Sequence, residues 1–310
     1  DPAAYDSAMA RAVERFQRRH GIVPDGTVGA ETRAAMNVPV EDRIRSIKLN
    51  LDRWRWLPRD LGEHFVMVNV AGQEMAVVRD GEPALTMNVI IGEVANQTPI
   101  FQDTMEHIVV NPYWNVPQSI AEEELWPKVE RDPTYLARND YEVVGSGDAR
   151  RIRQKPGRSN ALGHVKFLFP NDLNIYLHDT PTGHLFSRSA RAFSHGCIRL
   201  ERPDDLARYL FTHATDRGAD EYDALRARST EQWVNLSEKL PVYVLYFTAW
   251  ADEEGNTRFY PDVYARDRAM DTLARAKLDG EADAAAGAVG APAEDPGAVD
   301  VAAGGAPPSG

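Results

Sequence analysis

The feature that most constrains the fold is a change of hydrophobic period near residue 65 of the 310-residue chain. Upstream, apolar residues step by three and four from Val40 to Trp54, which predicts one amphipathic helix. Downstream, apolar residues alternate with other residues, which is typical of strands, and Asp80-Gly81 predicts a tight hairpin turn. A mostly β domain is therefore expected, with strands in 65–70, 75–78, 85–91, 107–110, 165–169, 175–178 and 242–247.

Both ends of the chain differ from this β region. Residues 9–16 have helical spacing, turn formers follow, and a second short helix is predicted from Glu31 to Met36. Past Ala269 the sequence is mainly Ala, Gly, Pro and acidic residues, which offer little to bury, so we expect disorder there. Residues 279–310 hold six acidic residues and no Lys or Arg, half of the net charge of -12. The remainder is only mildly acidic, and nothing in it favours nucleic-acid binding.

The only cysteine, Cys197, stands two residues after His195 and two before Arg199. If residues 193–200 form a strand, these three side chains share one face and the apolar residues between them face the core. Nearby positive charge favours the thiolate, which is the nucleophilic form, so we expect a lowered pKa for Cys197. A structural cysteine would be expected on the apolar face instead. The pattern therefore favours a reactive thiol.

His178 is the second candidate for chemistry. It ends the alternating run 174–178, and the ends of strands are common places for catalytic side chains. An imidazole beside a thiol can accept its proton and later return it to a leaving amine. Four other histidines are interpreted as ordinary hydrogen-bonded residues: His20, His64, His107 and His213.

These residues resemble the signature of the L,D-transpeptidases of bacterial cell walls, in which a histidine precedes Ser/Thr-His-Gly-Cys, an apolar residue, and Arg or Asn. The matching positions are His178, Ser194, His195, Gly196, Cys197 and Arg199. Further segments are similar to the large periplasmic branch with an inserted lid: Gln97-Thr98-Pro99, 111–117, Pro156-Gly157, 160–163 and 176–181. Residues 16–32 resemble the small helical peptidoglycan-binding module, without its first helix.

The resemblance implies a cysteine acyl transfer. The Cys197 thiolate would attack the carbonyl of the third stem-peptide residue, expel the terminal D-alanine and form a thioester. The side-chain amine of another stem would then take the acyl group, giving a 3-to-3 cross-link. His178 would be the base, His195 would orient or position, and backbone amides at Gly196 and Cys197 would hold the oxyanion. Carbapenems would acylate the same thiol.

Several roles stay open at this stage. Arg199 either pairs with a substrate carboxylate or forms an ordinary structural ion pair. Asp179, where many members of the family have Gly or Ser, either orients His178 as in a triad or caps a turn. Within the insertion, Trp126 and Tyr135 either contact substrate or anchor the lid to itself. The residues proposed to bind substrate are Arg199, Ser194, Asp179, Asn160, Gly163 and Tyr176.

No metal or organic cofactor is expected. Zinc held by His178, His195 and Cys197 is the alternative, but a zinc site normally has additional supporting ligands. No apolar stretch approaches the ~18 residues of a membrane span, and a lone cysteine excludes an internal disulfide framework. By resemblance, the partners are peptidoglycan stem peptides and the location is the periplasm or cell envelope. We also expect a monomer.

Five segments are therefore expected: a partial peptidoglycan-binding-like helical module (1–38), a connecting helix (39–64), the L,D-transpeptidase catalytic domain of sandwich or barrel type (65–268), its lid insertion (119–158) and a disordered tail (269–310). Alternatives to transpeptidation are an L,D-carboxypeptidase or a cross-link-cleaving endopeptidase, since one nucleophile and one base serve all three. A wall-binding protein without turnover is the non-enzymatic alternative.

Overall fold

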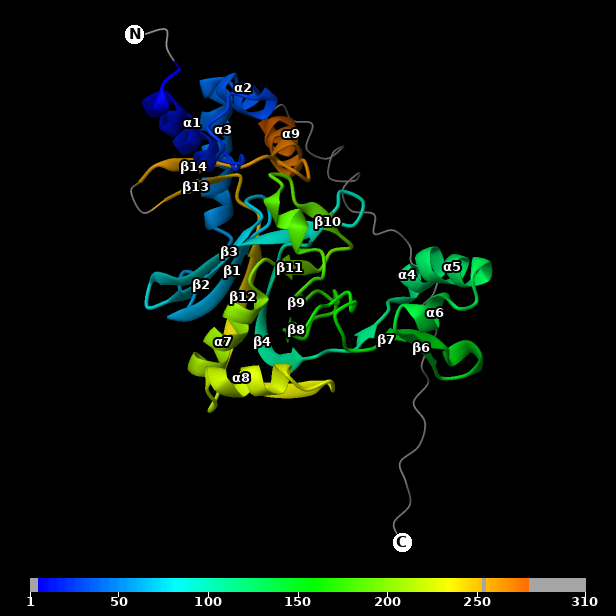
Figure 1. Ribbon diagram of the computed structural model, residues 1–310. Coiled ribbons are helices and arrows are strands. Elements are labelled where there is room, and N and C mark those ends of the chain that lie inside the picture. Colours follow the sequence, from blue (N-terminus) through cyan, green and yellow to red (C-terminus); the bar gives the residue numbers. More distant parts are fainter. Residues whose placement is uncertain (1–4, 253–254, 279–310) are drawn as a thin grey trace. The chain divides into compact units, whose positions relative to one another are not determined.

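The computed structural model describes residues 5–252 and 255–278. Its main sheet has the strand order β10-β3-β11-β9-β8-β4-β12-β1-β2, and a further pairing of β2 with β3 closes the sheet on itself (Figure 1). The sandwich or barrel expected from the sequence is therefore present as a closed sheet with β10 attached outside the ring. The strands are β1 (His64–Asn69), β2 (Glu74–Arg79), β3 (Glu82–Gly92), β4 (Phe101–Val110), β8 (Val165–Leu168), β9 (Leu177–His178), β10 (Ala192–Ser194), β11 (Ile198–Leu200) and β12 (Gln232–Leu245).

Alternation along the strands produces the core. Val66 lies opposite Val77 of β2 and Val242 of β12, and all three are fully buried. Because successive residues of a strand face opposite sides, every second side chain of these strands enters the same cluster. Helices α7 (Pro203–His213) and α8 (Ala219–Arg226) add Leu206, Leu210 and Tyr222 to it. The predicted Asp80-Gly81 hairpin is confirmed, with φ of 54° and 84° at its two central residues.

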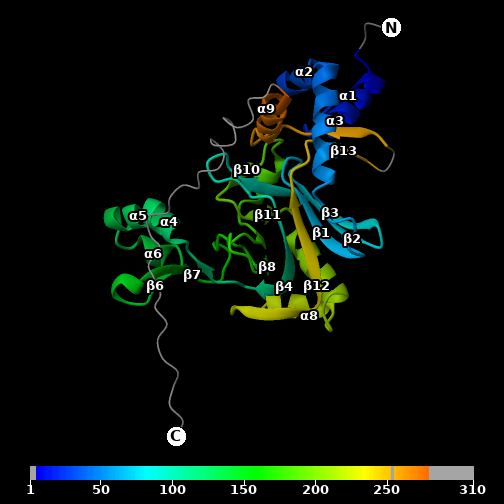
Figure 2. The same ribbon diagram turned by 180° about the vertical axis from the view of Figure 1, so that it is seen from behind.

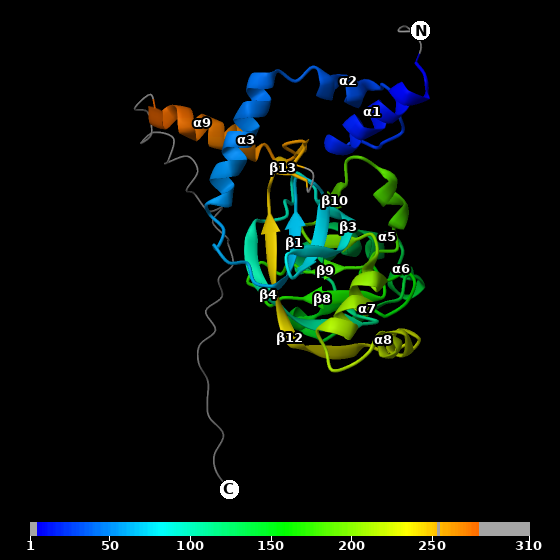
Figure 3. The same cartoon turned by 90° about the vertical axis from the view of Figure 1, so that its left-hand side faces the viewer.

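The N-terminal helices are α1 (Ser7–Arg19), α2 (Ala30–Met36) and α3 (Val40–Trp54), and they lie at one end of the barrel (Figure 3). Arg19 donates to the carbonyl of Thr257 in the hairpin β13 (Ala249–Ala251) and β14 (Thr257–Phe259), and Ser189 Oγ donates to Glu31. The expected packing of this module on the main domain is confirmed.

Helix α3 is present as predicted, but its apolar stripe is not the buried face. Val40 and Leu51 are exposed, whereas Asn50 and Arg53 are buried. The reason is polar: the Asn50 side chain accepts from the amide of Thr248 and donates to its hydroxyl, which fixes that side of the helix against the sheet. Apolar residues spaced by three and four predict that a segment is helical. They do not predict which face of the helix is buried.

The insertion between β4 and β8 forms a small unit beside the barrel (Figure 2). Its own sheet has the order β5-β7-β6, and Trp126 and Tyr135 pack on its own cluster around Leu125 and Ile152, as predicted for anchoring residues. Its elements are β5 (Trp114–Asn115), α4 (Gln118–Ile120), the π-helical turn η1 (Ala121–Leu125), α5 (Trp126–Arg131), α6 (Tyr135–Arg138), β6 (Tyr141–Val144), the short 3-10 turn η2 (Gly147–Ala149) and β7 (Arg151–Gln154).

The prediction of disorder from residue 269 onward is wrong for its first part. A helix, α9 (Arg266–Leu278), continues through these residues and belongs to a compact unit separate from residues 1–264. The sequence there still contains Met270, Leu273 and several helix-forming residues, and its propensity outweighs the low hydrophobicity. The rest of the predicted tail, 279–310, lies outside the described residues.

Candidate active site

The cysteine segment is a bend between two strands and not one continuous strand. β10 ends at Ser194 and β11 begins at Ile198, so Cys197 stands immediately before β11. Gly196 has φ of 111°, a backbone conformation that other residues rarely adopt, and this breaks the strand. After the bend, the predicted alternation holds, since Ile198 and Leu200 are buried while Arg199 is only half-buried.

Two hydroxyl groups fix the shape of this bend. Ser194 Oγ donates to the carbonyl of Cys197 at 2.5 Å and accepts from the amide of Gly196 at 3.2 Å. Thr98 Oγ1 donates to the carbonyl of Gly196 at 2.8 Å. The Gly196 amide is therefore engaged within the bend, so it is the less available of the two amides expected to hold the oxyanion. Within the described part of the chain, the Cys197 amide has no such partner, so it is the better candidate.

Parallel pairing with β9 brings the sequence-predicted residues together. Arg199 pairs with His178 and Ile198 with Leu177, while the Ile198 amide donates to the carbonyl of Tyr176 at 3.1 Å. Tyr176 and His178 are two residues apart, so they share one face of the sheet with Arg199. Their rings are in edge contact, with centroids 5.6 Å apart. The face beside Cys197 thus carries Tyr176, His178 and Arg199.

His178 is held as a neutral imidazole. It is 4% exposed, and burial lowers its pKa to about 3, with the charges of Arg199 and Lys166 acting in the same direction. Its Nδ1 lies 2.5 Å from the carbonyl oxygen of Asp179. Since a carbonyl only accepts, Nδ1 carries the proton and Nε2 keeps the lone pair. Nε2 is therefore the atom that can accept a proton from a thiol.

The resting Cys197 is a thiol, contrary to the expectation of a lowered pKa. Burial raises the pKa of Cys197 and outweighs the opposing effects of the Tyr176 amide and hydroxyl and of the Arg199 charge. The expected cation at His195 does not contribute, because that exposed side chain turns to Glu124 of the insertion, with Nε2 to Oε1 at 3.3 Å. Deprotonation of the thiol therefore requires a base at the moment of attack.

Three residues predicted to bind substrate, Asn160, Gly163 and Asp179, instead hold the local backbone in place. Asn160 is fully buried, donates to the carbonyls of Pro112 and Lys155, and accepts from the Leu162 amide. A Cβ on Gly163 would lie 2.2 Å from the Asp179 carboxylate. The Asp179 carboxylate itself accepts from the amides of His164 and Thr180, so the turn-capping alternative is the one the geometry matches. The group that orients His178 is the backbone carbonyl of Asp179, not its carboxylate.

Arg199 does not form the structural ion pair considered above. Among the described residues, no carboxylate lies within ion-pairing distance of it, and its buried Nε has no hydrogen-bond partner. Its Nη1 lies 3.4 Å from the hydroxyl of Thr182. Sequence reasoning missed Lys166, which lies opposite His178 in β8. The alternation Val165-Lys166-Phe167 was a usable signal, because it places this lysine on the outer face of a predicted strand.

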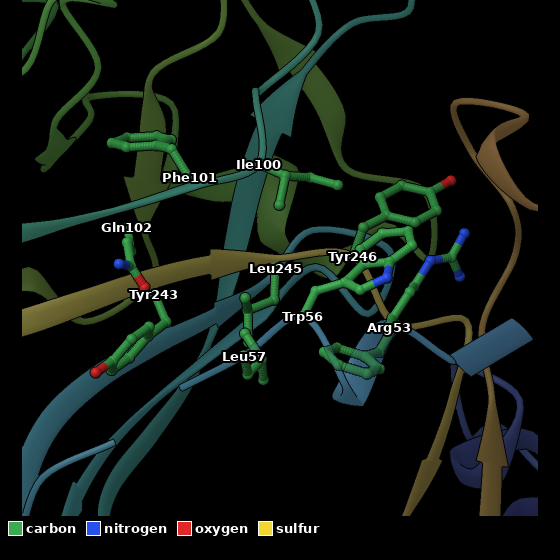
Figure 4. Close-up of a pocket in the computed structure, with 10 residues that line it drawn as sticks. Arg53, Trp56, Leu57, Ile100, Phe101, Gln102, Tyr243, Leu245 and Tyr246 are labelled. Atoms are coloured by element: carbon green, nitrogen blue, oxygen red, sulfur yellow. The ribbon is translucent and has the colours of Figure 1, made fainter. Parts of the chain in front are cut away.

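Other features lie away from this face. A pocket of 220 Å³ between the end of α3 and strands β4 and β12 is lined by Trp56, Ile100, Tyr243 and their neighbours, none of them from the cysteine segment (Figure 4). In residues 5–252 and 255–278, no three His, Cys, Asp or Glu side chains are grouped to hold a metal ion, which leaves the zinc alternative without support there. No helix in the same ranges has the length and hydropathy of a membrane span.

Comparison with known proteins decides the family. The model of the L,D-transpeptidase catalytic domain matches residues 63–223. The chain belongs to the L,D-transpeptidase family. A second model, "Putative peptidoglycan binding domain", matches residues 2–36. A curated Haemophilus influenzae protein named "Putative L,D-transpeptidase" is 34% identical over 241 residues, which cover 72% of this chain and 48% of that protein. This chain thus spans about half the length of that relative.

Solved structures of L,D-transpeptidases are also similar. One from Mycobacterium smegmatis has a TM-score of 0.32 at 18% identity, covering 59% of this chain and 58% of that one. One from Xylanimonas cellulosilytica has a TM-score of 0.28 at 13% identity, covering 77% and 81%. The family assignment rests on the catalytic-domain model and on the curated relative.

Gly163 offers a test of the turn that carries Asp179. We expect Gly163→Ala to lower the free energy of unfolding by about 2 kcal/mol more than Gly147→Ala, measured by urea titration at pH 7. Both glycines have φ near 60°, so the backbone strain is matched, but around Gly147 no described atom lies within 4 Å of an added Cβ. Equal losses would show that the Asp179 carboxylate moves aside freely.

Buried His178 makes stability depend on pH. Its folded pKa of about 3 is below the 6.5 of an exposed histidine, so the unfolded chain binds the proton more readily between these values. The stability is complete above pH 6.5 and is lost as the pH falls towards 3. From pH 7 to pH 5 we expect the free energy of unfolding to fall about 2 kcal/mol further in wild type than in His178→Asn.

Urea titrations of the two proteins at both pH values measure this difference. His20, whose pKa burial also lowers, is present in both proteins and cancels in the comparison. Parallel pH dependences would mean that His178 is not kept neutral by burial.

Proposed function

We propose that this protein joins peptidoglycan stem peptides by 3-to-3 cross-links, through a thioester on Cys197. The observation that carries the proposal is the sheet face formed by β9 and β11. On it Cys197 lies beside Tyr176, and His178, two residues further along, has a lone pair on Nε2. Nucleophile, base and a free backbone amide are the three groups that acyl transfer needs.

In the first half-reaction, the Cys197 thiol transfers its proton to His178 Nε2 while sulfur bonds to the carbonyl carbon of the third stem residue. The tetrahedral oxyanion is stabilised by the Cys197 amide and by the Tyr176 hydroxyl, which also hydrogen-bonds the sulfur. The carbon–nitrogen bond then breaks. His178 returns the proton to the nitrogen of the departing D-alanine, and a thioester remains.

The second half-reaction reverses these roles. The side-chain amine of an acceptor stem attacks the thioester carbonyl, His178 accepts a proton from that nitrogen, and sulfur leaves and regains the proton as a thiol. Water in place of the amine would give a carboxypeptidase or an endopeptidase with the same residues. The insertion that reaches His195 through Glu124 acts as the lid that favours the amine over water.

The surroundings are consistent with a wall substrate. The module of α1 and α2 matches a peptidoglycan-binding model, and the catalytic model belongs to a family that acts on the same polymer. We place the protein in the periplasm or cell envelope, acting as a monomer without a cofactor, and its thiol is expected to be acylated by carbapenems.

Intact-protein mass spectrometry after incubation with a purified disaccharide-tetrapeptide tests the proposal. We expect wild type to gain the mass of the donor less one D-alanine and to release cross-linked dimers, and Cys197→Ala to do neither because it lacks the nucleophile. Reactions with and without an added amine acceptor separate transfer from hydrolysis.

A tripeptide product without dimers would replace transpeptidation by hydrolysis. If no adduct or product forms while both proteins still bind sacculi, the catalytic proposal fails, and a wall-binding role takes its place.

A further inference from the structure

Three neighbouring strands place three basic side chains in one row. Lys166 of β8 pairs with His178 of β9, and His178 pairs with Arg199 of β11. All three point away from the core, because their neighbours Phe167, Leu177 and Ile198 are buried in it. His178 is neutral, so the row consists of two cations on either side of the proposed base.

In the part of the chain that the structure describes, neither cation forms an ion pair with an acid. In the described residues, no carboxylate lies within ion-pairing distance of Lys166 or of Arg199. The Lys166 ammonium lies 6.0 Å from the ring centroid of Tyr176 and 5.8 Å from that of Trp233. Glu231 attracts it from further away but is bonded to the Tyr113 amide and the Trp233 indole.

Two partly buried cations without an ion-pair partner among the described residues raise the free energy of the free protein. Burial lowers the pKa of both Lys166 and Arg199, which means that water solvates their charged forms poorly. Two like charges in one row also repel each other. A carboxylate bound between them would relieve both costs, and the aromatic rings around Lys166 limit competition from water.

The position of the row matches the proposed substrate. Cys197 precedes Arg199 by two residues, about 7 Å along a strand. A donor whose reacting carbonyl is at Cys197 carries its terminal carboxylate one residue further on, about 3.6 Å away at full extension. The flexible side chains of Lys166 and Arg199 can bridge the remaining distance. Diaminopimelate has a second carboxylate on its side chain, within similar reach.

We propose that Lys166 and Arg199 together bind a carboxylate of the donor stem peptide, and so select donors in which that group is free. The inference rests on the proposed function and adds the recognition element. The carboxylate belongs either to the terminal D-alanine or to the diaminopimelate side chain, and amidated donors distinguish the two.

The test compares wild type, Lys166→Met and Lys166→Arg on three purified disaccharide-tetrapeptides. One donor has both carboxylates free, one has the terminal D-alanine as its amide, and one has the diaminopimelate side chain as its amide. Thioester formation is followed by intact-protein mass spectrometry over a range of donor concentrations. Lys239→Met, which removes an exposed lysine paired with Glu106, is the matched control, and thermal unfolding verifies the fold of each variant.

On the free donor we expect Lys166→Met to raise the half-saturating concentration at least tenfold and to change the limiting rate less than threefold. Lys166→Arg and Lys239→Met should stay within threefold of wild type. One of the two amides should weaken wild type by a similar factor and make wild type and Lys166→Met equal, which identifies the carboxylate.

The inference is overturned if Lys166→Met is impaired equally on all three donors, or if neither amide weakens wild type. These results differ from a failure of the proposed function, in which wild type forms no thioester with any donor.

Discussion

The candidate site depends on the parallel pairing of two very short strands, β9 and β11. Only four residues are in register, with Leu177 beside Ile198 and His178 beside Arg199. Their inner members, Leu177 and Ile198, are fully buried, so the hydrophobic core sets the register of the outer row. A shift of the register by one residue would turn His178 towards the core and Leu177 towards the outer face. It would also separate the proposed base from the thiol. The packing of the core therefore also sets the geometry of the site.

The pKa values on this face explain why Cys197 stays protonated in the free protein. Burial raises the pKa of the Cys197 thiol and lowers that of His178, so proton transfer between them is strongly uphill in the free protein. Part of the low pKa of His178 comes from the charges of Arg199 and Lys166. Under the proposed mechanism, a donor carboxylate that offsets these charges would raise the pKa of His178 as the reacting carbonyl arrives. Recognition and activation are then coupled through one imidazole.

The sequence was a good guide where burial follows a simple period. The longer strands were predictable because alternation repeats along them, and the hairpin because Asp80-Gly81 favours a tight turn, whereas the period of helix α3 predicted the helix but not its buried face. The bend at Gly196 was not predictable, since one positive φ interrupts an otherwise strand-like run. A lowered pKa for Cys197 was also wrong, because neighbours in sequence do not reveal depth of burial. Asn160 and Asp179 were predicted to bind substrate, but both hold the local backbone, and only their hydrogen bonds show this.

The insertion is a compact piece with few contacts to the main sheet. Its helices and strands pack on one another around their own apolar cluster, and none of them shares an extensive contact with a described strand of the main sheet. At the cysteine segment it is held by the half-exposed pair of Glu124 and His195, a type of contact worth less than about 1 kcal/mol. Under the proposed function, so weak an attachment would let the insertion move aside as one piece, and a rigid glycan strand too long to thread into a pocket would then enter and leave from the side.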